Sequence, residues 1–217
     1  MESYKSEFID FRGIFTHLAM AEDLAETEKQ IAKWQNIVSK TDTKGLLLHL
    51  QNTAGTMYLQ VDNTNMRRVG IALYGLMPDL PANCDIKPDL KPLISLKGRI
   101  VNIHTAYNGD GVSYSYTYRA KGDRTIATVP IGYADGVPRA LSNKIYGILN
   151  GKKVPQVGNI TMDQMMFDIT GVEATLGDVI TLLDEENNIN KWAEILNTIN
   201  YELICRLKVR LPRVYTR

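Results

Sequence analysis

The first third of the chain alternates uniformly apolar runs with a segment of helical periodicity. The apolar runs occupy residues 13–18, 45–50 and 69–74, and residues 22–39 between the first two place apolar side chains three and four positions apart. Apolar runs separated by helices are typical of parallel strands that are covered on their faces. The pattern therefore predicts three parallel strands with two crossovers, as at the end of a larger α/β sheet or barrel.

A stretch rich in proline and glycine, residues 75–92, separates this region from one with a different rhythm. Beyond it the pattern is one of short strands and turns, with Asn150-Gly151 as a typical hairpin turn. Strands are predicted at 92–106, 114–119, 125–131, 146–149, 161–169 and 178–183, a short helix at 190–199 and an extended segment at 209–215. Many short strands at this spacing predict a closed or nearly closed β structure. We therefore divide the chain into residues 1–78 (α/β) and 79–217 (all-β).

The predicted parallel strands lack part of their surroundings. Three such strands with only some of their helices leave one sheet edge unpaired and one face bare, and exposed parallel edges are normally covered. The sequence therefore predicts that the first domain is an incomplete part of a larger α/β sheet or barrel.

Composition and charge exclude several functional classes. With 25 basic and 24 acidic residues the formal net charge is +1, and no dense basic block suggests a nucleic acid or an anionic membrane as partner. No secretory signal and no apolar stretch long enough for a bilayer occurs. Cys84 and Cys205 form no metal-binding spacing with the three histidines, and they favour a reduced, cytoplasmic setting.

Candidate ligand contacts follow the predicted parallel strands. His49 and Thr53 come at the end of one strand, where α/β folds place ligand contacts. Arg68 precedes the next, and Gly70 would let backbone N–H groups approach an anion closely. The same residues are compatible with a structural histidine, a helix-capping threonine, a solvated arginine and a packing glycine, so both interpretations stay open.

Three further candidates lie in the β-rich region. Tyr114 follows a tight bend, although tyrosines at alternate positions also commonly cover one face of a strand. Tyr133 lies in a turn-rich polar loop after an apolar strand. Met162-Asp163-Gln164 interrupts an otherwise apolar predicted strand, so its polar groups require partners or water.

Taken together, these segments resemble alanine racemase over essentially the whole chain. The order and separation of the matching stretches make the resemblance specific, although each stretch alone is weak. They are Gly-Ile-Phe-Thr-His-Leu-Ala (13–19), His-Leu-Gln-Asn-Thr-Ala-Gly (49–55), Gly-Ile-Ala-Leu-Tyr-Gly (70–75), Gly-Val-Ser-Tyr (111–114), Ala-Thr-Val-Pro-Ile-Gly-Tyr-Ala-Asp-Gly (127–136), Met-Asp-Gln (162–164) and Asn-Tyr-Glu (200–202). The resemblance implies the last strands of a (β/α)8 barrel followed by a β-barrel-like domain, with pyridoxal 5′-phosphate as cofactor.

The resemblance also implies catalytic roles. Racemisation requires proton-transferring groups on opposite faces of a planar intermediate. Tyr114 would serve one face and a lysine bound to the cofactor the other. Arg68 would face the pyridine nitrogen of the cofactor and keep it neutral, His49 would hold Arg68, and His17 would belong to the network that activates Tyr114.

The remaining implied roles concern binding and assembly. Thr53, the backbone N–H groups of Gly70 and Ile71, and the hydroxyl of Tyr201 resemble the family's phosphate-binding set. Met162 would lie near the substrate carboxylate and Tyr133 would narrow the entry. In a head-to-tail homodimer, Tyr114, Tyr133 and Met162 would serve the partner's barrel, while Arg68 and Tyr201 would serve their own.

One part of the family pattern has no counterpart in the chain. None of its lysines lies in a segment that resembles the one carrying the Schiff-base lysine. We therefore expect a racemase fragment that is inactive alone, from an enzyme that would supply D-alanine for peptidoglycan. The alternatives are a non-catalytic racemase-like protein or β-domain interaction module, and a racemase that prefers serine.

Overall fold

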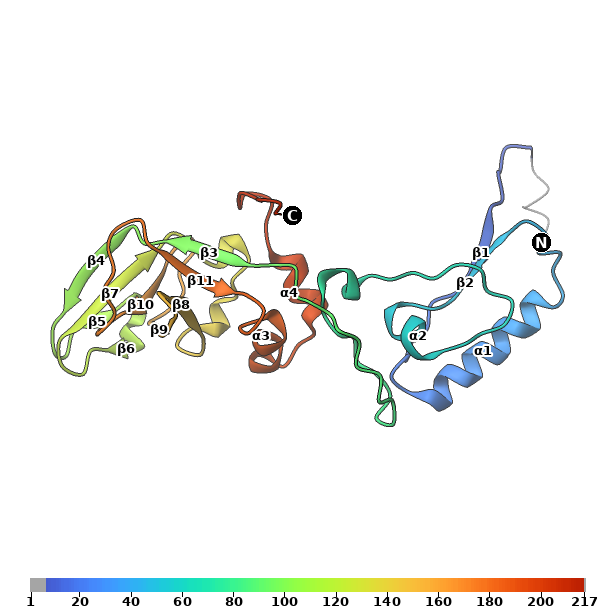
Figure 1. The fold of residues 1–217 in the computed structure, drawn as a ribbon, viewed down its shortest axis with the longest axis horizontal. Helices are drawn as coiled ribbons and strands as arrows, with labels where there is room; N and C mark the ends of the chain where they lie inside the picture. The colour runs from blue at the N-terminus through green and yellow to red at the C-terminus, as the bar shows by residue number, and fades with distance from the viewer. Residues whose placement is uncertain (1–6, 217) are drawn as a thin grey trace. The chain divides into compact units, whose positions relative to one another are not determined.

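The computed structural model describes residues 7–216 and contains two compact units, residues 1–91 and 92–217 (Figure 1). The predicted linker, 75–92, lies almost entirely in the first unit, and the second begins at Pro92. Within the described residues, no helix has both the length and the apolar character needed to cross a bilayer.

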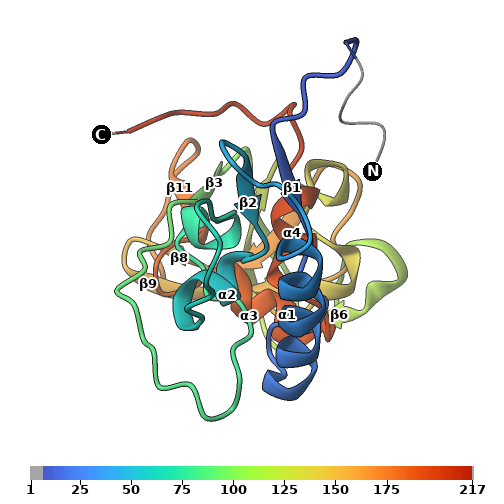
Figure 2. The same cartoon turned by 90° about the vertical axis from the view of Figure 1, so that its right-hand side faces the viewer.

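The first unit is built on a pair of parallel strands joined by a helix. Strand β1 (Gly13–Phe15) pairs with β2 (Leu47–His49), and α1 (Leu24–Val38) forms the crossover (Figure 2). Asp23 caps α1 by accepting a hydrogen bond from the Glu26 N–H. The apolar face of α1 is buried in a cluster with both strand regions, as the helical periodicity predicts; its members include Leu18, Trp34, Val38, Leu48 and Leu50.

The third predicted strand, residues 69–74, is wrong. Residues 65–68 do run beside β2, because the Asn65 N–H donates to the Leu48 carbonyl and the Arg68 N–H donates to the Gln51 carbonyl. However, the Leu48 N–H is bound by the Asn65 side-chain oxygen, which replaces a regular ladder bond. The chain then turns at Gly70 into a short 3₁₀ helix, Ile71–Tyr74. Only Ile71 of that apolar run is buried. The strand prediction failed because a uniformly apolar run does not specify backbone dihedral angles.

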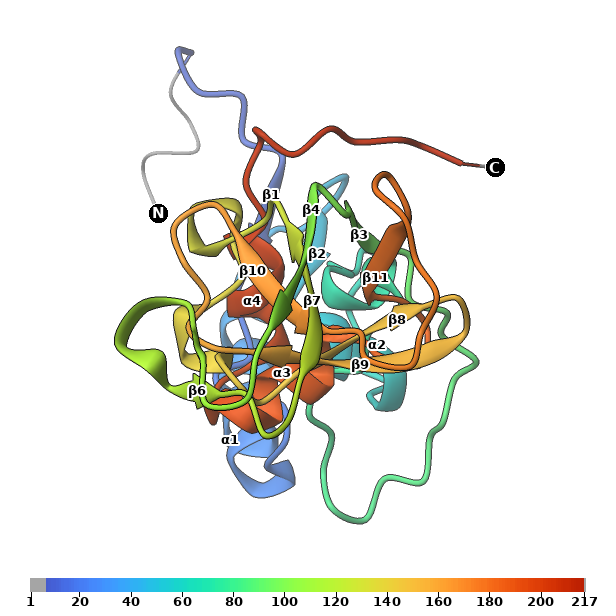
Figure 3. The ribbon, with the colours of Figure 1, turned by 90° about the vertical axis from the view of Figure 1, so that its left-hand side faces the viewer.

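A seven-stranded antiparallel sheet forms the second unit. Its spatial order is β3-β11-β8-β9-β10-β7-β4. The strands are β3 (Leu96–Arg99), β4 (Asn102–Ala106), β7 (Arg124–Val129), β8 (Tyr146–Leu149), β9 (Lys152–Val157), β10 (Met165–Asp168) and β11 (Val179–Leu183). The edge strands β3 and β4 are separated in the chain by only Ile100 and Val101, so the sheet must curl to bring its edges together (Figure 3). The result is a half-barrel, close to the predicted barrel-like form.

Turns of the second unit follow their local sequence. Asn150 and Gly151 have φ values of 50° and 74° and join β8 to β9, as the Asn-Gly dipeptide predicts. A smaller hairpin of β5 (Gly111–Val112) and β6 (Tyr118–Arg119) projects beside the sheet.

Three other expectations for this unit need correction. Residues 114–119 are not one strand, because Ser113, Ser115 and Tyr116 have positive φ; a 3₁₀ helix, Tyr114–Tyr116, precedes β6. The predicted strand 161–169 is shortened to β10, since 161–164 form a turn. The helix 190–199 is α3 (Ile189–Leu196), and a second helix, α4 (Asn200–Arg206), follows it.

A glycine in β8 gives a test of the sheet packing. A Cβ on Gly147 would lie 2.3 Å from Ile180 Cγ2, so Gly147→Ala must displace a fully buried side chain. We expect this change to lower the free energy of unfolding by about 1–3 kcal/mol in urea titrations. Gly151→Ala, which meets no atom within 4 Å but has φ of 74°, should show only backbone strain of about 1–2 kcal/mol. A Gly147→Ala protein as stable as wild type would contradict the packing.

Candidate functional site

The guanidinium of Arg68 is held at the carboxyl ends of β1 and β2. Its Nη1 lies 2.5 Å from His49 Nδ1, and its Nη2 lies 2.8 Å from the Thr16 carbonyl oxygen and 3.0 Å from His17 Nδ1. Parallel pairing brings these groups together. Phe15 aligns with His49, and the Thr16 N–H, just after β1, donates to the His49 carbonyl, so the chain continues along the same edge. The structure therefore gathers Arg68, His49 and His17 into one cluster.

Protonation within this cluster follows from the donors of arginine. A guanidinium has no acceptor, so Nδ1 of both histidines must accept, which places each ring proton on Nε2. Burial lowers the pKa of His49, and the positive charge of Arg68 lowers it further. His49 is accordingly held neutral. The ring of Phe15 stacks on His49 at 5.4 Å and also lies 5.4 Å from the Arg68 Cζ, which covers one side of the cluster.

Thr53 and Gly70 form a second contact at the same edge. Thr53 is the first residue of α2 (Thr53–Tyr58), and its Oγ1 accepts a hydrogen bond of 2.8 Å from the Gly70 N–H. The cap of α2 is Asn52, whose side chain accepts from the Gly55 N–H, so Thr53 is not needed as a cap. A Cβ on Gly70 would meet only Thr53 Oγ1, at 3.9 Å. The space beside this pair is open, and the buried Ile71 follows directly.

In the second unit, Tyr114 borders a cavity of about 490 Å³. The cavity is lined by residues 113–116 and by Thr161, Asp163, Gln164 and Met166. The side chain of Tyr114 is 73% exposed, and the exposed Met162 lies on the turn that contributes Thr161 and Asp163. Thr161 closes that turn by bonding with both the N–H and the carbonyl of Gln164. Tyr114 and the Met162 turn thus lie at one cavity.

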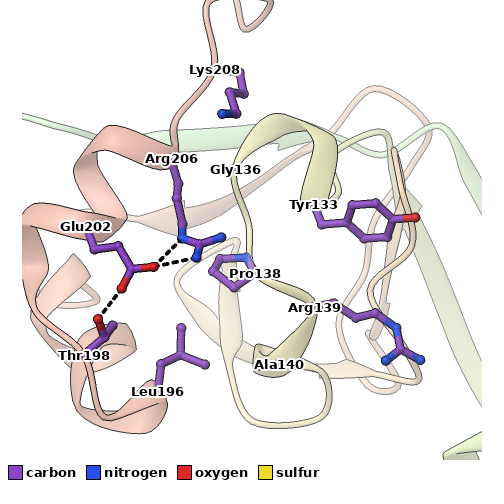
Figure 4. Close-up of a pocket in the computed structure, with 10 residues that line it drawn as sticks. All are labelled: Tyr133, Gly136, Pro138, Arg139, Ala140, Leu196, Thr198, Glu202, Arg206 and Lys208. Carbon is purple, nitrogen blue, oxygen red and sulfur yellow. Dashed lines mark hydrogen bonds and ion pairs between the residues drawn. The ribbon is translucent and has the colours of Figure 1, made fainter.

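Tyr133 lines a second cavity of about 470 Å³, together with α4 (Figure 4). The opposite wall carries an ion pair between Glu202 and Arg206, and the Thr198 hydroxyl also donates to Glu202. These bonds from Thr198 and Arg206 lower the pKa of the Glu202 carboxyl. Tyr201 is the preceding residue of α4 and is exposed.

The loop that carries Tyr133 is tied to the chain after α4 by an ion pair that the sequence did not single out. Asp135 is buried, and its two oxygens accept from Arg210 Nε at 2.6 Å and Nη2 at 2.9 Å. Its carboxylate also binds the Gly132 N–H, and its backbone carbonyl binds the Lys208 N–H. The separation of 75 residues explains why no local pattern indicates the pair.

The Asp135 carboxyl is kept ionised by these contacts. Burial alone raises its pKa, but hydrogen bonds from Arg210 and Gly132 and the charge of Arg210 outweigh burial, so the pKa lies below its ordinary value. The stabilisation from ionised Asp135 is therefore present above the unfolded-state pKa and is lost as the pH falls through the lower folded value.

The Arg68 cluster gives a prediction about pH. Because the folded pKa of His49 is lowered, its bond with Arg68 is complete above about pH 6.5 and is lost as the pH falls through the folded pKa. His49→Ala should lower the free energy of unfolding by about 1–2 kcal/mol at pH 8, and this difference should shrink towards pH 5. His104→Ala, at an exposed position of β4, is the control. Equal effects of the two variants, or a constant His49→Ala difference, would contradict the geometry.

The Asp135 ion pair gives a second prediction. Asp135→Asn removes the charge that Arg210 binds, and we expect a loss of about 1–3 kcal/mol in urea unfolding at pH 7. Because the folded pKa of Asp135 lies below its ordinary value, the difference between wild type and variant should begin to shrink below about pH 4 and should disappear only as the pH falls through the lower folded pKa. Glu173→Gln, at an exposed site, should leave the unfolding curve unchanged. A difference that persists in acid would show that charge is not the cause.

Comparisons with known proteins place both units in one family. Residues 93–215 match the family model described as "Alanine racemase, C-terminal domain", and residues 2–78 match "Alanine racemase, N-terminal domain". The alanine racemase of Nostoc sp. is 39% identical over 216 residues, which are 95% of this chain and 55% of that protein.

Solved structures give the same result. An alanine racemase of Clostridium difficile is 37% identical with a TM-score of 0.89, covering 99% of this chain and 57% of that one. The Bacillus anthracis enzyme, solved with bound L-Ala-P, is 37% identical with a TM-score of 0.87, covering 97% and 56%. This chain therefore spans a little more than half the length of the relatives that it matches. From the match of both units, the chain belongs to the alanine racemase family.

Proposed function

We propose that the protein takes part in the interconversion of L-alanine and D-alanine with pyridoxal 5′-phosphate as cofactor. The observation that carries the proposal is the Arg68 guanidinium, fixed by His49 and His17 next to the Thr53–Gly70 contact. Its donors suit a pyridine nitrogen, and the open space beside Gly70 suits a phosphate group. The residues present therefore fit the cofactor, which when bound would withdraw electrons from the amino acid Cα.

Arg68 would determine how strongly the cofactor withdraws electrons from the amino acid Cα. An arginine stays protonated in proteins, so it donates a hydrogen bond to a ring nitrogen but does not transfer its proton. Arg68 would thereby leave a bound pyridine nitrogen unprotonated and its electron withdrawal weak, which would disfavour side reactions such as transamination. Because His49 and His17 fix the guanidinium, Arg68 holds this position without rearrangement when the cofactor binds.

Thr53, Gly70 and Ile71 would bind the phosphate from the first unit. Thr53 Oγ1 already accepts from the Gly70 N–H, so its hydroxyl proton can be donated to a phosphate oxygen. The Ile71 backbone N–H would add a donor, and the Gly70 N–H would add another by turning from Thr53 Oγ1 to the phosphate. The resemblance implies the Tyr201 hydroxyl as a further donor.

Tyr114 would transfer the proton at its hydroxyl oxygen on one face of the substrate. A free tyrosine has a pKa near 10, so it requires nearby positive charge or hydrogen-bond donors. The Arg68–His17 pair could supply them, because His17 Nδ1 accepts from Arg68 and leaves Nε2–H as a donor. We propose that Tyr114 approaches the Arg68–His17 pair of the other subunit in a homodimer, in which Tyr114, Tyr133 and Met162 serve the partner's barrel. Tyr133 would narrow the entry and Met162 would lie near the substrate carboxylate.

The remaining parts of the proposal rest on the resemblance. The lysine for the opposite face would lie in the part of the family fold that this chain does not span. The product would be D-alanine for peptidoglycan, made in the cytoplasm. A non-catalytic racemase-like protein and a racemase with a preference for serine are the alternatives that the experiment below separates.

A hybrid enzyme tests the proposal. The Nostoc racemase residues that precede the matched region would be joined to this chain and assayed with pyridoxal phosphate and each enantiomer of alanine and serine. We expect racemisation of alanine by the hybrid, none by the chain alone, and no Schiff-base absorbance for the chain alone.

The hybrid also tests the role of Tyr114. Tyr114→Phe should lower kcat by about 10²–10⁴-fold, because it removes a proton-transferring group. Tyr107→Phe, at another exposed tyrosine of the same unit, is the control. A folded hybrid that binds the cofactor without racemising alanine would favour the non-catalytic alternative, and faster turnover of serine would favour the other.

A further inference from the structure

The backbone that presents Tyr114 is in an unusual conformation. Ser113, Ser115 and Tyr116 have φ values of 64°, 61° and 45°, in a region that side chains other than glycine rarely adopt. Such residues each cost free energy and persist only where surrounding contacts fix them. A specific contact must therefore hold this segment.

Asn159 supplies that contact. Its side chain is buried, with the residue 6% exposed, and its Nδ2 donates to the Tyr114 carbonyl at 2.8 Å. In return the Ser113 hydroxyl donates to the Asn159 carbonyl at 2.6 Å. The two hydrogen bonds join the same two short segments in opposite directions, so they fix both the distance and the orientation between them.

Neighbouring contacts make the fit close. Gly158 approaches the Tyr114 segment so nearly that a Cβ there would lie 2.5 Å from the Val112 carbonyl oxygen. The other end of the segment is held by Asn143, whose Nδ2 donates to Thr117 Oγ1 at 3.1 Å and whose Oδ1 accepts from the Gly158 N–H at 2.7 Å. Residues 113–117 are thus fixed at both ends by side-chain amides.

We propose that Asn159 is the positioning residue for Tyr114. Its amide holds the strained turn from which the tyrosine hydroxyl is presented, and through residues 160–162 the same segment leads to Met162. One buried amide therefore sets Tyr114 relative to the Met162 turn across their shared cavity. The catalytic consequence rests on the proposed racemase function, whereas the structural role of Asn159 does not.

The structural role is tested by Asn159→Asp in the full chain. The aspartate has nearly the same size but no donor, and its charge faces the Tyr114 carbonyl. We expect hydrogen–deuterium exchange of residues 111–119 to become about tenfold faster or more, as expected when a buried hydrogen bond is lost. Asn187→Asp is the matched control, because Asn187 is 3% exposed and its Nδ2 also donates to backbone carbonyls, at Leu182 and Tyr146. Unchanged exchange in Asn159→Asp, or the same increase in the control, would overturn the proposal.

The catalytic consequence is measured in the hybrid enzyme. A displaced Tyr114 should lower kcat by about 10- to 100-fold. The deuterium isotope effect should rise for the Cα-deuterated enantiomer whose proton Tyr114 removes, and should not rise for the other. General loss of folded enzyme would leave both isotope effects unchanged, so equal isotope effects in variant and wild type would refute positioning.

Two outcomes separate this inference from the proposed function. Faster exchange at 111–119 in a protein whose wild-type hybrid is inactive would reject the racemase proposal and keep the structural role of Asn159. An active wild-type hybrid with unaltered Asn159→Asp kinetics would keep the racemase proposal and reject Asn159 as the positioning residue for Tyr114. If Asn159→Asp does not fold, Ser113→Ala removes the other hydrogen bond of the pair and is read by the same exchange and isotope measurements.

Discussion

The Arg68 guanidinium and its acceptors form the constraint on which the first unit's candidate site depends. An arginine can only donate hydrogen bonds, so its position is fixed by whatever acceptors surround it. Here these are Nδ1 of two histidines and the carbonyls of Thr16, His49 and Leu50, and all lie where parallel strands end. The arrangement decides which nitrogen of each histidine carries the proton. The segment that follows the Asn65 contact with β2 carries Arg68 to this edge.

The second unit follows a different rule, in which buried polar groups hold exposed aromatic ones. Tyr114 and Tyr133 line cavities and lie on connecting segments, and such segments need contacts that fix their backbone. Asn159 provides them for Tyr114, and the Asp135–Arg210 ion pair provides them for the loop of Tyr133. The antiparallel sheet supplies the rigid frame from which these loops project. The exposed residues are therefore the ones that the family resemblance names, whereas the buried residues decide where they lie.

Errors in the predicted elements share one physical cause. Residues 69–74 and 114–119 carry apolar or aromatic side chains in a strand-like pattern, but the first forms a 3₁₀ helix and the second begins with one. A pattern of apolar positions reports which side chains are to be buried, and it leaves the backbone angles to packing. Where local chemistry does restrict those angles, as at Asn150-Gly151, the predicted and observed structures agree.

The sequence by itself determined the family, the change from α/β to β structure, helix α1 and the β8–β9 hairpin. Short motifs and local periodicity carry that information. Sequence also named the residues that cluster around Arg68, through their resemblance to family motifs. Only the tertiary structure decided how those residues are held: the tautomers of the two histidines, the Asn159 contact with Tyr114 and the pairing of Asp135 with Arg210. The last two contacts join residues 45 and 75 positions apart, and no local pattern records a contact that exists only after the chain has folded.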